Sequence, residues 1–211
     1  MKKMSHPELL DMGYTTGNNI DYFVRLGCKV HVDDYIATTL QRRASAPPAK
    51  RDAAASTAAR RSFDRRRDRS PAKRPPERIA PLDYETGQFN VVLCWDLFDY
   101  LSPEAAVQTG RELRRITGAG GLLLAFFGPR SNTAVRPPRR FRIVGEAIEV
   151  QEIDGPRVKP YHLANREVQK IFADFEVSQT VLLKSGVREM LMRKESSTRD
   201  GRPSTLVRRA G

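Results

Sequence analysis

The chain has 211 residues, 39% of them hydrophobic, and carries a formal net charge of +12. This length suits one domain of ordinary size. No apolar run reaches the ~20 residues of a membrane-spanning helix, and no apolar secretory segment precedes residue 9, so we expect a cytoplasmic protein. The three histidines lie far apart and the two cysteines lack ligand spacing, so no metal site is predicted.

Most of the positive charge lies in one segment, residues 42–78, which has thirteen Lys/Arg and four Asp/Glu and a net charge of +9. The segment is rich in Ala, Arg, Pro and Ser, and Phe63 is its one large apolar side chain. Such a composition cannot offset the entropy of ordering, which predicts a disordered basic insertion. Phosphate neutralisation makes nucleic acid a candidate partner of this arm, and the alternative is an insertion that is tolerated in a surface connection.

The N-terminal part reads as a strand, a glycine turn, a helix and a second strand. Residues 9–11 form a short apolar run before the turn, and Ile20, Phe23 and Val24 follow at helical spacing. Residues 28–32 then alternate as a strand that ends at Asp33 and Asp34. An acidic pair about 20 residues beyond the first glycine is where a nucleoside-binding α/β fold places its ribose-holding carboxylate.

The glycine turn excludes two common ligand motifs. Thr15 and Asn18 stand where a dinucleotide fingerprint has its second and third glycines, and a P-loop lysine is missing between Lys3 and Lys29. An aspartate, Asp11, precedes the first glycine by two residues. A carboxylate there repels a pyrophosphate and suits a cationic ligand.

The rest of the chain continues the alternation of strands and helices. Ser102-Pro103-Glu104 provides an N-cap, a first-turn proline and an early acid, so a helix begins there. Asn165 is expected to cap another. The strands are expected at 91–94, 120–127, 175–183 and 186–193, with a small hairpin within 141–151.

Three of these stretches resemble the class I S-adenosylmethionine-dependent methyltransferases. Asp11-x-Gly13-x-x-x-Gly17 followed by Asp33-Asp34 resembles their motif I and its acidic partner. Residues 87–96 resemble their fourth strand, and 120–126 their glycine pair and fifth strand. The resemblance implies a Rossmann-like, mostly parallel sheet with an antiparallel C-terminal hairpin. It implies one domain over 1–195, interrupted by the insertion, and a flexible tail at 196–211.

The resemblance also implies S-adenosylmethionine as the cofactor and a methyltransferase activity. It assigns cofactor binding to one set of residues: Asp11, Gly13, Thr15, Gly17, Asp33, Asp34 and Trp95. Asp96 and His162 are the catalytic candidates. Either would act as a general base, which is needed only if the acceptor must lose a proton. The sequence lacks the Asn/Asp-Pro-Pro-Tyr/Phe motif of enzymes that methylate amino groups of bases, and the acceptor is not readable.

Three features depart from the family pattern. Only eight residues precede the first strand, whereas the family usually carries covering helices there. The basic insertion falls where the family places its second helix and third strand. Arg78 stands where an adenine-contacting aspartate is common. These departures leave an alternative, a non-catalytic protein that keeps the fold and acts as a basic binding module.

Overall fold

The structure is a computed structural model, and it describes residues 6–45, 79, 81–129 and 134–196. Apart from the helices at 35–45 and 97–99, which were not predicted, the elements follow the order that the sequence predicts. They are β1 (Glu8–Asp11), α1 (Gly17–Arg25), β2 (Lys29–Val32), α2 (Tyr35–Ser45), β3 (Phe89–Trp95), the 3-10 helix η1 (Leu97–Asp99), α3 (Pro103–Ile116), β4 (Thr117–Phe127), β5 (Arg139–Val144), β6 (Ala147–Glu152), α4 (Asn165–Ile171), β7 (Phe175–Leu182) and β8 (Arg188–Lys194).

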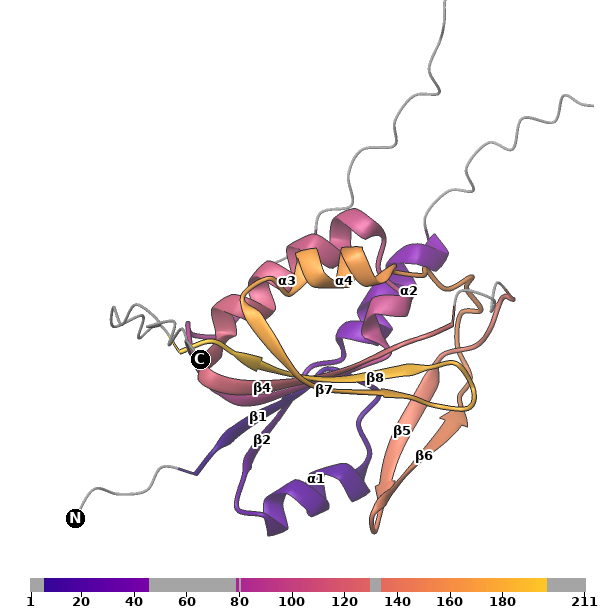
Figure 1. The fold of residues 1–211 in the computed structure, drawn as a ribbon. Coiled ribbons are helices and arrows are strands. Elements are labelled where there is room, and N and C mark those ends of the chain that lie inside the picture. Colours follow the sequence, from indigo (N-terminus) through magenta and orange to yellow (C-terminus); the bar gives the residue numbers. More distant parts are fainter. Residues whose placement is uncertain (1–5, 46–78, 80, 130–133, 197–211) are drawn as a thin grey trace, which may run out of the picture.

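Six of the strands form one sheet, in the order β2-β1-β3-β4-β8-β7 (Figure 1). The first four run parallel, and β8 pairs antiparallel with both β4 and β7. This confirms the predicted fold class. Strand β1 lies between β2, which follows it in the chain, and β3, to which the chain then crosses back. The strand order therefore reverses at β1. Open α/β sheets hold ligands at the carboxyl ends of such a strand pair.

The two faces of the sheet are covered differently. Helices α2, α3 and α4 lie over one face, while α1 and the β5–β6 hairpin lie on the other (Figure 1). Right-handed crossovers explain this split, since the connection from β1 to β2 and the connection from β2 to β3 run in opposite directions across the sheet. The carboxyl ends of β1 and β3 therefore lie between α1 and the helical layer, and we call this edge of the sheet the crevice.

Helix α3 forms as its sequence predicts. The hydroxyl of Ser102 accepts a hydrogen bond from Ala105 N–H (3.2 Å), and Pro103 occupies the first helical turn. One face of the helix is buried: Ala106, Gly110, Leu113 and Ile116. Its apolar side chains share a core cluster with Val92 and Cys94 of the central strand β3, which are fully buried.

Helix α1 differs from the sequence expectation in the face that it buries. Ile20 is 36% exposed and Val24 is 53% exposed, although both were predicted to lie on the inner face with Phe23. The residue that α1 buries instead is Asn19, which is 1% exposed. The reason is that Asn19 forms two hydrogen bonds with the backbone of β5, which local periodicity cannot reveal.

The predicted start of the insertion is also wrong. Helix α2 continues through Arg42 to Ser45, so the family's second helix is present rather than replaced. Arg43 explains the continuation, because its guanidinium donates to the carbonyl oxygens of Tyr100 (3.2 Å) and Lys159 (2.8 Å). The rest of the insertion, 46–78 with Arg78, and the tail from 197 lie outside the described residues.

Helix α4 begins at Asn165, as predicted, but Ala164 rather than Asn165 is its N-cap residue. The Glu167 carboxylate accepts the Ala164 N–H (2.5 Å) and so completes the first turn. Val168 and Phe172 are buried against the core. Within the described ranges, none of the helices has the length and apolar character needed to span a membrane.

Candidate functional site

Asp11 ends β1 at the crevice and is 1% exposed. Its Oδ1 accepts hydrogen bonds from Gly13 N–H (3.0 Å) and from Trp95 Nε1–H (2.7 Å). Its Oδ2 is buried and has no hydrogen-bond partner among the described residues. Burial raises the pKa of the Asp11 carboxyl, and the nearby donors of Gly13, Trp95, Thr15 and Asn19 act in the opposite direction. The crevice therefore contains a carboxylate oxygen that a cationic or hydrogen-bonding group could satisfy.

Trp95 lies across the glycine turn. A Cβ built on Gly13 would come within 2.3 Å of Trp95 Cδ1, so only glycine fits beneath this ring. The Trp95 backbone is left-handed, with φ at 48°, a conformation that costs a side-chain-bearing residue about 1–3 kcal/mol. The sequence placed Trp95 at the site but did not predict that its indole would cover Gly13.

The β5–β6 hairpin closes one side of the crevice. The Phe141 ring stacks on the Trp95 indole, with centroids 5.2 Å apart and planes 5° from parallel. Asn19 fixes the hairpin to α1: its Nδ2 donates to Phe141 O (2.9 Å), and its Oδ1 accepts Ile143 N–H (2.9 Å). The sequence did not predict the two hydrogen bonds of Asn19, because they join positions 122 and 124 residues apart.

The start of α1 remains open. A Cβ built on Gly17 would meet nothing within 4 Å, and Thr16 caps the helix by accepting Asn19 N–H (3.2 Å). Thr15 Oγ1 lies 3.5 Å from Gly13 O. The predicted turn residues Gly13, Thr15 and Gly17 therefore share one loop, but Gly13 is covered by Trp95 whereas Gly17 is accessible.

The acidic pair follows β2, beside this loop. Asp33 N–H donates to Asp11 O (2.9 Å), and Asp33 Oδ2 lies 3.5 Å from the Tyr84 hydroxyl. Burial raises the pKa of Asp33, whereas Asp34 is exposed. Burial also raises the pKa of the Tyr14 phenol, and the charges of Asp34 and Asp96 add to this shift. Tyr14, which the sequence did not single out, therefore lies within electrostatic reach of both carboxylates.

Asp96 belongs to a buried arginine–aspartate cluster, made of Asp96, Asp99, Arg136 and Arg139. Asp96 Oδ2 lies 2.7 Å from Arg139 Nη2 and also accepts the Tyr100 hydroxyl (2.9 Å). Asp99 Oδ2 lies 2.7 Å from Arg136 Nη2. Asp96 is 0% exposed, and its Oδ1 has no partner among the described residues. The cluster joins the end of β3 to the segment that leads into the hairpin.

His162, the second catalytic candidate, lies in the segment before α4. Tyr161 N–H donates to Asp99 O (2.7 Å), which holds this segment beside the arginine–aspartate cluster. Both ring nitrogens of His162 are buried and lack hydrogen-bond partners in the described part of the chain. The described residues contain no group of three His, Cys, Asp or Glu that could hold a metal ion.

Known proteins share this architecture at low sequence identity. No protein-family model and no curated protein matches the sequence. An S-adenosylmethionine-dependent methyltransferase from Mesorhizobium loti superposes with a TM-score of 0.51 and 12% identity, over 92% of this chain and 94% of that one. The PH0226 protein from Pyrococcus horikoshii OT3 superposes with a TM-score of 0.50 and 13% identity, over 92% and 84%. At these identities the comparison establishes the fold, and the chain has the fold of the class I S-adenosylmethionine-dependent methyltransferases.

Proposed function

We propose that the chain binds S-adenosylmethionine in the crevice between β1 and β3 and transfers its methyl group to an acceptor. One observation beyond the fold carries the proposal: Asp11 Oδ2 is buried without a partner among the described residues. A buried carboxylate is costly unless it is paired. The ammonium and sulfonium groups of S-adenosylmethionine are cations, and a cation is the partner that this oxygen lacks.

The remaining predicted cofactor residues suit the rest of such a ligand. The exposed carboxylate of Asp34, beside the partly buried Asp33, is available to accept the two ribose hydroxyls in charge-assisted hydrogen bonds. Gly17 leaves the start of α1 open to the polar end of the ligand. When bound, S-adenosylmethionine supplies an electrophilic methyl group, so the protein can act largely by aligning the acceptor with it.

Asp96 and His162 are proposed to act on the acceptor. Asp96 Oδ1 is the oxygen that the arginine–aspartate cluster leaves unbonded in the described structure, so it can accept a hydrogen bond from an acceptor hydroxyl or amine. Both nitrogens of the His162 imidazole are buried without partners in the described structure, and the ring is proposed to take the proton that such an acceptor loses. Neither role is needed for an acceptor that carries no proton on its nucleophilic atom.

Trp95 supports a second candidate function. Its indole lies against Gly13, where the cofactor would approach, so binding requires the ring to move. A protein in which the ring stays in place would keep the fold without the activity. It would act as a basic binding module through the charged segment 42–78, for which nucleic acid is the proposed partner. Binding of S-adenosylmethionine or S-adenosylhomocysteine separates the two functions.

Replacing Asp34 tests the ribose assignment. Asp34→Ala is expected to weaken the affinity for S-adenosylhomocysteine about tenfold or more, because charge-assisted hydrogen bonds contribute about 1.5–3 kcal/mol. Isothermal titration calorimetry measures the change, and circular dichroism checks the fold. Asp83→Ala, at another exposed aspartate, is the matched control and should bind normally. Equal affinities in the two variants would contradict the assignment.

A further inference from the structure

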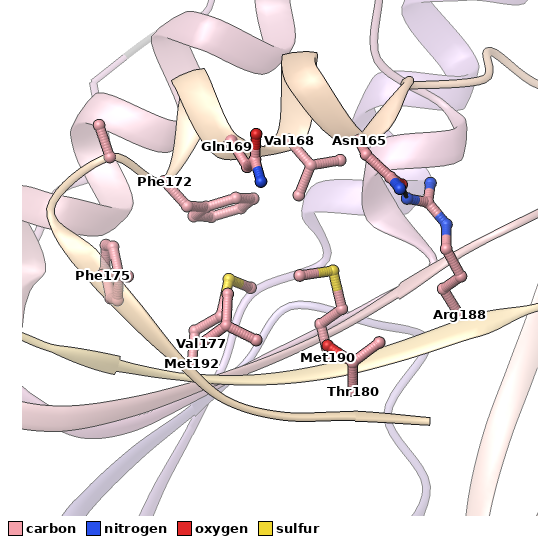
Figure 2. A pocket seen from close by; sticks show the side chains of 11 residues that line it. Asn165, Val168, Gln169, Phe172, Phe175, Val177, Thr180, Arg188, Met190 and Met192 are labelled. Atoms are coloured by element: carbon pink, nitrogen blue, oxygen red, sulfur yellow. Dashed lines mark hydrogen bonds between the residues drawn. The ribbon is translucent and has the colours of Figure 1, made fainter. Parts of the chain in front are cut away.

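A cavity lies between α4 and the strands β7 and β8, and none of the proposed cofactor residues lines it. Its volume is about 420 Å³, within the range of small-molecule pockets. One wall comes from α4 and the residues that follow it, and the floor comes from the two strands (Figure 2). It lies on the face of the sheet that α2, α3 and α4 cover, opposite the β5–β6 hairpin (Figure 1).

The cavity exists because α4 is short. The helix ends at Ile171, after seven residues, and the chain enters β7 at Phe175. The helix therefore covers Met192, which is 0% exposed, but leaves Val177 on the edge strand 45% exposed. A longer helix would have covered this part of β7 as well.

The lining is chemically distinctive. Met190 and Met192 present their thioethers on the floor, and Phe172 faces them from the helical side (Figure 2). All three side chains are at least 92% buried. Thioether sulfurs make favourable contacts with aromatic rings, and methionine side chains adapt to the shape of a ligand. Because these side chains are buried against one another, the flexible methionines must shift to admit an aromatic ring, which would then contact Phe172 on one face and the thioethers on the other.

The polar side chains of the lining are Asn165, Gln169, Thr180 and Arg188. Gln169 directs its amide toward the space between helix and strands (Figure 2). Arg188 is held at one end, where it donates to Leu163 O (2.9 Å) and to Asn165 Oδ1. A mostly apolar pocket with a few polar groups at its edge fixes the orientation of a ligand that carries one polar substituent.

We propose that this cavity is a binding site for a small aromatic molecule that carries one hydrogen-bonding substituent. The site is independent of the proposed cofactor crevice. It takes the ring between Phe172 and the two methionines, with the substituent directed toward Gln169 at the rim.

Methionine methyl groups provide the test, with phenol as the probe. The full-length protein carrying [13C]methyl methionine is titrated with phenol and, separately, with cyclohexanol, which has the same hydroxyl on a non-aromatic ring. We expect saturable shifts of the Met190 and Met192 methyl signals, no shift of Met12 beside the crevice, and phenol binding about two- to tenfold tighter than cyclohexanol. Met190→Leu and Met192→Leu assign the signals.

A pair of variants on β7 makes the test specific. Thr180→Phe, whose new ring enters the cavity, should abolish the phenol shifts. Glu176→Phe places the same ring at an exposed position of β7 outside the lining and should leave them unchanged. Equal binding of phenol and cyclohexanol, or shifts of Met12 equal to those of Met190, would overturn the proposal. A further result would also overturn it: Met190 and Met192 signals that shift with protein concentration in the absence of phenol, together with dimerisation in analytical ultracentrifugation. A second copy of the chain would then cover the cavity.

Discussion

Arg136→Met is expected to lower the free energy of unfolding by about 3–5 kcal/mol, the cost of leaving a buried charge without its partner. The Arg136 side chain is 10% exposed, and its Nη2 lies 2.7 Å from Asp99 Oδ2. Burial, reinforced by the charge of Asp96, already raises the pKa of Asp99. Removing the guanidinium leaves Asp99 buried beside Asp96 without the cation closest to it.

An exposed ion pair of the same chain supplies the matched control. Arg142 Nε lies 3.5 Å from Glu149 Oε2, and both side chains are largely in solvent, at 47% and 60% exposure. Arg142→Met should therefore change the free energy of unfolding by no more than about 0.5 kcal/mol. Urea unfolding followed by circular dichroism measures both variants. Similar losses in the two would show that the arginine–aspartate cluster does not hold the end of β3 to the hairpin.

Asp11→Asn is expected to separate cofactor binding from stability. Asparagine keeps an oxygen for Gly13 N–H and Trp95 Nε1–H but removes the charge that a cationic ligand requires. The affinity for S-adenosylmethionine should fall about 10- to 100-fold, the effect of losing a hydrogen bond to a charged group. Calorimetric titration measures it. Asp21→Asn, the same change on the exposed surface of α1, should bind as the wild type does.

The stability of Asp11→Asn should not fall with its affinity. Burial raises the folded-state pKa of Asp11 above its unfolded value, so its contribution to stability is present at acid pH and lost as the pH rises through the folded-state pKa. Asparagine does not ionise, so the variant does not lose this stability as the pH rises. The difference in melting temperature, variant minus wild type, should therefore increase from acid to neutral pH. A variant that both melts lower and binds normally at neutral pH would assign Asp11 a structural role alone.

The sequence predicted most elements of the fold because each of these has a local signal. Val92 and Cys94 lie in an apolar run that is typical of a buried parallel strand, and Ser102 with Pro103 marks a helix start. The mostly parallel sheet and its closing antiparallel hairpin β7–β8 were implied by the resemblance to the class I methyltransferases, and the structure agrees with them.

The contacts that shape the site were not predictable, because they join distant positions. Asn19 reads as a polar helix residue, yet its amide holds a strand 122 residues away. Gly13 reads as a cofactor glycine, whereas in the structure its missing side chain makes room for Trp95. The arginine partners of Asp96 lie 40 and 43 residues beyond it, in a stretch that offered no pattern. Side-chain partners of this kind depend on the tertiary fold, which local periodicity does not encode.

The most direct test of cofactor binding in the crevice uses the only tryptophan of the chain, Trp95. Its indole is 2% exposed and lies on Gly13, so a ligand that occupies the crevice must displace it. We predict that S-adenosylhomocysteine causes a saturable change in tryptophan emission, with the same dissociation constant as calorimetry gives. An unchanged emission spectrum would contradict a cofactor site between β1 and β3. This holds both if calorimetry detects no binding and if it detects binding that leaves Trp95 undisturbed.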